Sequence, residues 1–427
     1  MLPSHDQQRA TEHYVSAYQA SSPRGRAEWQ LTRPFELGCV ALCVGQVAYL
    51  AASFVQGTWL ADPSGAPIAT DFVNVWAAGR QALAGAPAAI YDVALHKAAE
   101  AAAVGHDFAG EYPWLYPPFF LFVAVLLALL PHVTAAAAWL ALTFPAYVMV
   151  FRSIVRHRAS VLLACAYPGL LANAVVAQNG FLSAALLGGA LLLLESSPLV
   201  AGCLIGLLAF KPHLGILIPV ALMAGGHWRA IAAATVTVVL LALLSLAAFG
   251  LDAWVAFFES LPTASQSTLE LGRAEWGKLQ SAYGVVRMMG GASALAWSAQ
   301  GVLAGAVTIA LVVLWRGKAP FELKAAALAT GTLLVTPYIF LYDLVILAVA
   351  MAFLLRGNRG QTPISADATV GDMRILAVAG LLIVIFPLVK APVGFAAALV
   401  VAILIARRAG LIPGRLCASP STAMRLP

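Results

Sequence analysis

The sequence predicts an all-α polytopic membrane protein, and three observations support this prediction. Hydrophobic residues make up 61% of the chain and charged residues only 10%, whereas soluble domains have about 25% charged residues. The apolar residues come in repeated blocks, many of them close to the ~20 residues that a helix needs to cross a bilayer. The cations gather between these blocks, as they do in the cytoplasmic loops of membrane proteins. Because backbone polar groups cannot stay unpaired in lipid, we expect the blocks to be helices.

Twelve of the apolar blocks can serve as transmembrane helices. An even number places both termini on one side, and every basic cluster then falls on that side, which the positive-inside rule identifies as the cytoplasm. The basic clusters are the N-terminal arginines, Arg152/Arg156/Arg158, Arg229, Arg316/Lys318, Arg356/Arg359 and Arg407/Arg408. The twelve blocks are residues 35–55, 135–154, 160–177, 181–194, 198–210, 213–225, 230–249, 294–314, 323–336, 339–355, 373–388 and 393–406.

A further apolar block, residues 117–130, is short for a crossing. Counting it as a span would reverse the topology downstream, so we expect a re-entrant or interfacial helix on the outer side. Apolar residues at helical spacing predict an amphipathic helix at the membrane surface in each long outer loop. The predicted organisation is one transmembrane domain at 35–407, outer loops at about 56–116 and 250–291, and cytoplasmic tails at 1–34 and 408–427.

Composition also limits the function. The net charge of +6 comes from cations at helix ends, so it does not indicate a nucleic-acid partner. The five cysteines form no metal or disulfide pattern. The sequence contains no metal-ligand cluster, and a divalent cation is the one cofactor that it leaves open.

Asp71 begins the amphipathic segment of the first outer loop. Aspartate is a favoured helix N-cap, which gives the residue a structural explanation. A carboxylate at the membrane surface can also act as a general base toward an acceptor hydroxyl. The two roles are compatible if the side chain points into a cavity.

Lys211-Pro212-His213 is the most unusual polar group, because it interrupts an otherwise apolar stretch. A cation near membrane depth is costly, so it should face a cavity and have a partner. One explanation is a snorkelling lysine in a tight turn. The alternative is an anion site where Lys211 and His213 meet a phosphate or diphosphate. Lys278 precedes a helix-like stretch in the second outer loop and is a candidate for a second phosphate contact.

Other polar residues lie at the predicted outer side. Tyr116 can be explained as an interfacial aromatic, Gln178 and Asn179 as turn residues, and Gln280 as a solvated side chain. Asp343 falls inside an apolar block and therefore needs a partner, which we expect to be a lysine or tyrosine of another helix. The other polar residues at the predicted outer side are Tyr116, Gln178, Asn179, Gln280, Tyr338 and Tyr342.

An ordered set of short motifs between about residues 70 and 350 resembles glycosyltransferase family 87, whose members are GT-C-type membrane enzymes related to mycobacterial mannosyltransferases. Some members of the family carry a histidine where this chain has residues 338–343. The motifs here are Asp71-Phe72, Trp76-Ala77-Ala78-Gly79-Arg80, Gly85 followed by Tyr91-Asp92, Tyr116-Pro117-Pro118-Phe119, Gln178-Asn179-Gly180, Lys211-Pro212, Thr336-Pro337-Tyr338 and Tyr342-Asp343.

The resemblance implies a GT-C-type fold and a polyprenyl-phosphate-linked sugar donor, often mannose. It implies an inverting transfer to a lipid or glycan on the extracytoplasmic face of the bacterial inner membrane, with Asp71 as the catalytic base. We assign the donor phosphate to Lys211, His213 and Lys278. We assign sugar and lipid contacts to Trp76, Arg80, Tyr116, Gln178, Asn179, Gln280, Tyr338, Tyr342 and Asp343.

Two other classes of function fit parts of the pattern. A transporter or flippase of lipid-linked glycans would have ionisable residues along a path through the bilayer, and Asp343 is the main residue of that kind. A noncatalytic subunit of an envelope complex would not depend on Asp71 or Lys211. The clustering of the polar residues at the outer side favours the transferase.

Overall fold

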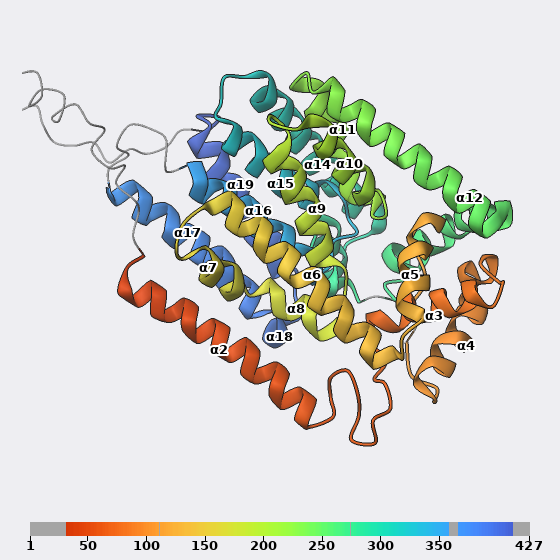
Figure 1. Ribbon diagram of the computed structural model, residues 1–427. Coiled ribbons are helices and arrows are strands. Elements are labelled where there is room, and N and C mark those ends of the chain that lie inside the picture. The colour runs from red at the N-terminus through yellow and green to blue at the C-terminus, as the bar shows by residue number, and fades with distance from the viewer. Residues whose placement is uncertain (1–30, 111, 274, 358–365, 413–427) are drawn as a thin grey trace, which may run out of the picture.

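The computed structural model describes residues 31–110, 112–273, 275–357 and 366–412, and within these ranges the regular secondary structure is helical, with no strand (Figure 1). The all-α prediction is therefore confirmed. Most of the two predicted tails and part of the 356–372 connection lie outside the described residues.

Within the described ranges, four helices are long and apolar enough to cross a membrane. They are α2 (Arg33–Val55), α6 (His132–Val155), α12 (Trp228–Ser265), which continues through a π-helical turn (Gln266–Glu270), and α14 (Ser293–Arg316). Shorter apolar helices fill other predicted blocks: α5 (Leu121–Ala128), α9 (Gly180–Leu193), α10 (Pro198–Leu208) and α11 (Leu217–Ala224). The chain is thus a helical membrane protein, while the number of twelve crossings stays a prediction.

Several predicted blocks are interrupted. Residues 160–177 divide into α7 (Ser160–Ala166) and α8 (Gly169–Val176) at Tyr167-Pro168, because proline cannot donate a helical hydrogen bond. Residues 339–355 begin as a 3₁₀ turn, η6 (Leu341–Leu344), before α16 (Val345–Gly357).

The remaining elements complete the bundle around α16. The described side chains of α16 are almost all buried, as expected for a helix that is apolar all round. The other elements are α3 (Asp71–Leu83), η1 (Ala88–Tyr91), α4 (Val93–Val104), η2 (Pro118–Phe120), η3 (Pro212–Gly215), η5 (Trp276–Lys278), α13 (Ala282–Met288), α15 (Phe321–Val335), α17 (Ala366–Val384), α18 (Phe386–Val389) and α19 (Val393–Arg408).

The first outer loop differs from its prediction in one respect. Its amphipathic helix exists as α3, but most of α3 is buried against α5 and α4 rather than exposed along a membrane surface. The two helices approach closely at Gly79, where an added Cβ would lie 2.1 Å from the backbone oxygen of Ala124. The buried face of α3 therefore fixes the position of its first residue, Asp71. With eight residues, α5 is too short to cross a bilayer.

The element α12 contains the predicted span 230–249 and the helical segment predicted after it, and a kink at Gly250 separates the two parts. Gly250 interrupts its helical geometry with φ of 81°, a conformation that glycine adopts without a steric penalty.

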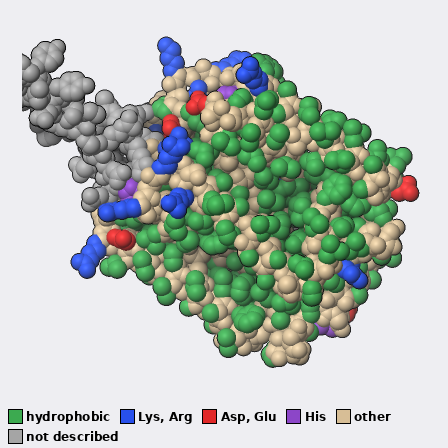
Figure 2. All heavy atoms as spheres, viewed as in Figure 1, with side chains coloured by type: hydrophobic (Ala, Val, Ile, Leu, Met, Phe, Trp, Pro, Cys, Tyr) green, Lys and Arg blue, Asp and Glu red, His purple; other side chains and the backbone are tan. Residues whose placement is uncertain are grey.

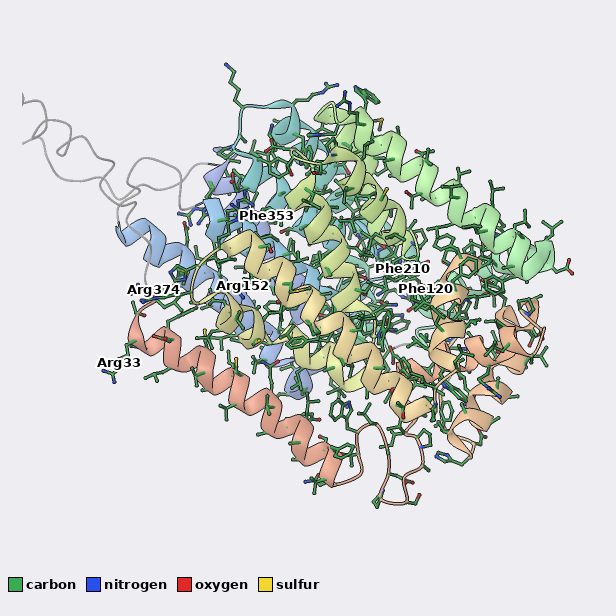
Figure 3. The ribbon with its side chains drawn as sticks, in the orientation of Figure 1. Arg33, Phe120, Arg152, Phe210, Phe353 and Arg374 are labelled. Atoms are coloured by element: carbon green, nitrogen blue, oxygen red, sulfur yellow. The ribbon has the colours of Figure 1, made fainter. Side chains whose placement is uncertain are left out.

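Basic residues gather at one end of the bundle. Arg33 at the start of α2, Arg152 in the last turn of α6 and Arg374 in α17 lie toward the same end in Figure 3. Figure 2 shows Lys and Arg side chains along that edge, next to a largely hydrophobic face. Cations at one end and an apolar flank are typical of a membrane protein that spans the bilayer with its flank and keeps its cations at one membrane face.

The helix α3 lies at the opposite end of α6 from these cations. The ring of His132, the first residue of α6, packs edge-on against Phe72 and Trp76, with ring centroids 5.4 Å and 5.6 Å apart. At 1.5 Å per residue, α6 is about 36 Å long, which exceeds the ~30 Å hydrocarbon core. The start of α3 is therefore separated from the basic end by about the thickness of a bilayer.

Replacing Gly79 with alanine should lower the thermal stability of the purified protein in detergent. The added methyl group collides with the α5 backbone, and such overpacking costs about 1–3 kcal/mol. Gly301→Ala is the matched control, because an added Cβ there meets no atom within 4 Å and alanine favours a helix. Equal melting temperatures for the Gly79 variant and the unchanged protein would contradict the close α3–α5 contact.

Candidate functional site

Three interruptions of the helices meet at one place. They are the turn at Gln178 and Asn179 before α9, Lys211 between α10 and η3, and the irregular stretch before η6. At Gly180 an added Cβ would lie 2.2 Å from the backbone oxygen of Tyr342, so only glycine allows this close approach. Irregular backbone at membrane depth is tolerated where it is buried in protein or lines a cavity.

A chain of hydrogen bonds leads to the carboxylate of Asp71. The Asn179 side-chain amide donates to the Tyr116 hydroxyl at 2.9 Å, and that hydroxyl donates to Gln178 Oε1 at 3.3 Å. The backbone N–H of Asn179 also donates to Gln178 Oε1, at 2.9 Å. Because Oε1 accepts both bonds, the amide orientation is fixed and Nε2 donates to Asp71 Oδ2 at 3.3 Å.

The surroundings of Asp71 place its titration near neutral pH. Burial raises the pKa of the Asp71 carboxyl to about 6, although the Gln178 hydrogen bond and the charges of Lys211 and Lys278 lower it. Asp71 is half-buried, so part of its surface stays open. A carboxylate that is ionised at pH 7 and can still be reached is suited to accept a proton.

Lys211 and Asp343 form a buried ion pair within reach of Asp71. Lys211 Nζ donates to Asp343 Oδ1 at 2.5 Å, and the two side chains are only 4% and 1% exposed. The backbone N–H of Phe340 donates to Asp343 Oδ2 at 3.1 Å, so both carboxylate oxygens have partners. Lys211 Nζ also lies 5.0 Å from the centre of the Tyr342 ring. The sequence predicts a lysine or tyrosine of another helix as the partner of Asp343, and the partner is Lys211, in the break between α10 and η3.

Aromatic rings pack beside the ion pair and the Asp71 network. Phe210, next to Lys211 in the chain, stacks on Phe120 with ring centroids 4.6 Å apart, and Tyr116 lies 4.8 Å from Phe120. Figure 3 shows Phe120 and Phe210 next to each other inside the bundle. These buried rings join the end of α10 to the Pro117-Pro118 turn that carries Tyr116.

Lys278 and His213 lie at the edge of this cluster. The charge of Lys278 reaches Asp71, although its Nζ forms an exposed ion pair with Glu275 at 2.9 Å. His213 lies on η3, two residues after Lys211, and its ring interacts with the charges of Asp343 and Lys211. The proposed phosphate contacts of both residues stay predictions.

Other predicted site residues have partners that do not connect them to Asp71. Trp76 Nε1 donates to the Leu130 backbone oxygen at 2.9 Å, and Arg80 lies over the Trp76 ring at 5.7 Å. Gln280 accepts from the Gly394 backbone N–H at 2.8 Å and donates to two carbonyls of its own loop. The Tyr338 hydroxyl donates to Ser265 Oγ at 2.7 Å. These contacts stabilise the surrounding loops, and roles in substrate binding stay predictions.

Two residues that support the site were not singled out from the sequence. Asn173 accepts from the Gly180 backbone N–H at 2.7 Å, and the Tyr167 hydroxyl donates to the Leu344 backbone oxygen at 2.7 Å. Asn173 is the one that the sequence signals, because an amide inside an apolar block needs a partner.

No group of three or more His, Cys, Asp or Glu side chains in the described part of the chain is arranged to hold a metal ion.

The fold and the site define a helical membrane protein with a buried carboxylate and a buried ion pair about a bilayer's thickness from a basic end. The family comparison identifies the class: residues 114–337 match glycosyltransferase family 87, and the chain belongs to this family. The matched residues include Tyr116, Gln178, Asn179 and Lys211, whereas Asp71 and Asp343 lie outside them. No curated protein and no solved structure gives a significant match to the chain.

The buried pair predicts a strong coupling between Lys211 and Asp343. Lys211→Met and Asp343→Asn should each destabilise the protein by about 3–5 kcal/mol, because each leaves the other charge buried without its partner. The double variant should lose much less than the sum, since it removes both charges. Thermal unfolding of the four proteins in detergent measures this coupling, and additive losses would contradict the pairing.

Proposed function

We propose that this glycosyltransferase moves a sugar from a polyprenyl-phosphate carrier to a hydroxyl of a lipid or glycan acceptor, on the extracytoplasmic face of a bacterial inner membrane. The resemblance noted in the sequence suggests mannose as the sugar. One observation carries the proposal. A reachable, ionised carboxylate, Asp71, lies close enough to a buried cation, Lys211, for their charges to interact.

Transfer from a lipid phosphate requires a base for the attacking hydroxyl and stabilisation of the charge on the leaving phosphate. In the proposed reaction the acceptor oxygen bonds to the anomeric carbon while the bond from that carbon to the phosphate oxygen breaks. The phosphate keeps the electron pair, and Asp71 takes the proton of the hydroxyl. Attack opposite the leaving phosphate inverts the anomeric centre.

Gln178 orients the base, and Lys211 stabilises the leaving phosphate. The Gln178 amide holds one oxygen of Asp71 and leaves the other oxygen for the acceptor hydroxyl. Lys211 Nζ has three N–H donors, of which one bonds to Asp343. Its other donors are available to a phosphate oxygen, where negative charge develops as the sugar leaves.

The placement of the site supports an extracytoplasmic reaction. Several helices run from the region of the site to the basic end. One of them, α16, directly follows Asp343 of η6 and has Arg356 in its last turn, where Arg356 pairs with Glu322 at 3.5 Å. If the basic end is cytoplasmic, as the positive-inside rule predicts, the site opens on the outer face. A polyprenyl chain would then stay in the bilayer while its phosphate reaches Lys211.

Asp71→Asn should lower sugar transfer by at least about a hundredfold, because general-base catalysis contributes 10²–10⁴-fold. The assay incubates purified protein with polyprenyl-phosphate mannose and cell-envelope lipid extract, and detects the sugar-bearing product by mass spectrometry. Asp252→Asn, an exposed aspartate on α12, is the matched control and should keep its activity.

Retained transfer by the Asp71 variant would contradict the assignment of the base. Translocation of a lipid-linked glycan in vesicles without any transfer product would instead favour the transporter.

The pH dependence of transfer should reflect Asp71. The rate should fall as pH drops through about 6, because protonation removes the base. Gln178→Ala removes a hydrogen bond that lowers the pKa of Asp71, so the acid limb should move to higher pH. Activity at pH 6 should then fall about threefold to tenfold more than activity at pH 8. Gln56→Ala, an exposed glutamine at the end of α2, should leave the profile unchanged. An equal loss at all pH values in the Gln178 variant would contradict this role.

A further inference from the structure

The two lipids that the site meets differ in charge. This inference rests on the proposed function. The donor is a phosphate diester with one negative charge. The spent carrier is a monoester whose second pKa is about 6, so it carries nearly two negative charges at pH 7. A site that completes many turnovers must bind the first lipid and release the second, although both have the same polyprenyl chain.

The buried charges of the site are poorly suited to a dianion. Lys211 is the one buried Lys or Arg side chain among the described residues, and Asp343 already neutralises it at 2.5 Å. Asp343 is held by Lys211 and by the Phe340 N–H, one on each oxygen. Asp71 adds a second carboxylate, and the charges of Asp71 and Asp343 both reach the Tyr342 hydroxyl.

We propose that Asp343 makes the site selective against the spent carrier. Through its bond to Lys211 it keeps that ammonium in place for the single charge of the donor, and its own fixed negative charge repels the second charge of the product. Asp343 is thus a positioning and selectivity residue for the lipid phosphate.

The same arrangement couples product release to the recovery of the base. Directly after transfer, Asp71 carries the proton of the acceptor and the phosphate carries the charge that Asp71 held. When Asp71 loses that proton to solvent, the buried groups hold one more negative charge. The two carboxylates then act together against the dianion, and the spent carrier leaves a site whose base is ready again.

The test compares the binding of two probes that need no sugar: farnesyl phosphate, a monoester, and its methyl diester. Dissociation constants are measured in detergent for a reference protein with Asp71→Asn, which removes the titration of Asp71. Two further proteins add Asp343→Asn or Asp343→Glu to this background. Thermal unfolding verifies that each protein is folded.

Asp343→Asn should shift the ratio of the two dissociation constants in favour of the monoester by about tenfold, because one fixed charge near the phosphate is lost. Asp343→Glu keeps the charge and should keep the ratio close to that of the reference. If both lipids bind and the ratio does not change in the Asn variant, the inference is overturned while the proposed donor class stands. If neither lipid binds the reference protein, the donor class fails and the inference fails with it.

A second test measures the two dissociation constants of the reference protein over a range of pH. It does not depend on the folding of any Asp343 variant. Between pH 5.5 and 7.5 the monoester gains its second charge while the diester keeps one. The groups that still face the phosphate are Lys211, Asp343, His213, Tyr116 and Tyr342, with Lys278 at the edge, and they act on both probes.

The affinity for the monoester, relative to the diester, should decrease as the pH rises. An increase would overturn the proposal, because it would mean that the site attracts the dianion.

Discussion

A charge buried inside a protein needs a partner, and the Lys211–Asp343 pair shows how this protein meets that constraint. The two residues lie 132 positions apart, at places where the chain leaves regular helix. Their attraction holds the break after α10 against the break before α16, and the Phe340 N–H completes the coordination of the carboxylate. Removing either charge alone would leave the other without compensation in a region of low polarity. The irregular backbone around them can therefore persist because it is held by side chains.

The proposed chemistry makes two opposite demands on the base, Asp71. A base must be ionised and yet able to take a proton, which requires some burial but also some stabilisation of its charge. Burial raises the pKa of Asp71, while the Gln178 hydrogen bond and the charges of Lys211 and Lys278 lower it. The resulting pKa is about 6. The hydrogen-bond chain through Tyr116 and Asn179 fixes the Gln178 amide. The site is thus organised before any substrate arrives, which is the condition for electrostatic catalysis.

Much of the fold follows from the sequence because lipid imposes simple rules. Apolar blocks predict helices, and basic clusters predict one common end; both appear in the structure. The exact division of the blocks does not follow, because a break such as Tyr167-Pro168 is held by a contact from Tyr167 to Leu344 that is remote in sequence. The burial of α3 was also missed, since an amphipathic pattern fits a membrane surface and a protein surface equally well.

The candidate site was predictable to a similar degree. The lone charges in apolar surroundings, Lys211 and Asp343, each require a partner, and the structure pairs them with each other. Local motifs were less reliable guides: Trp76 and Arg80 lie on the same helix as Asp71, but their contacts lead elsewhere. Asn173 was overlooked because its role depends on a turn seven residues further on.

An experimental structure of the protein with a non-hydrolysable phosphonate analogue of a polyprenyl-phosphate sugar tests the roles of Lys211 and Asp71 most directly. The phosphonate oxygens should lie within about 3 Å of Lys211 Nζ. Asp71 should face the anomeric carbon from the side opposite the phosphonate, with room for an acceptor hydroxyl between them. A phosphonate bound away from Lys211, or a sugar with its anomeric carbon turned away from Asp71, would contradict these roles.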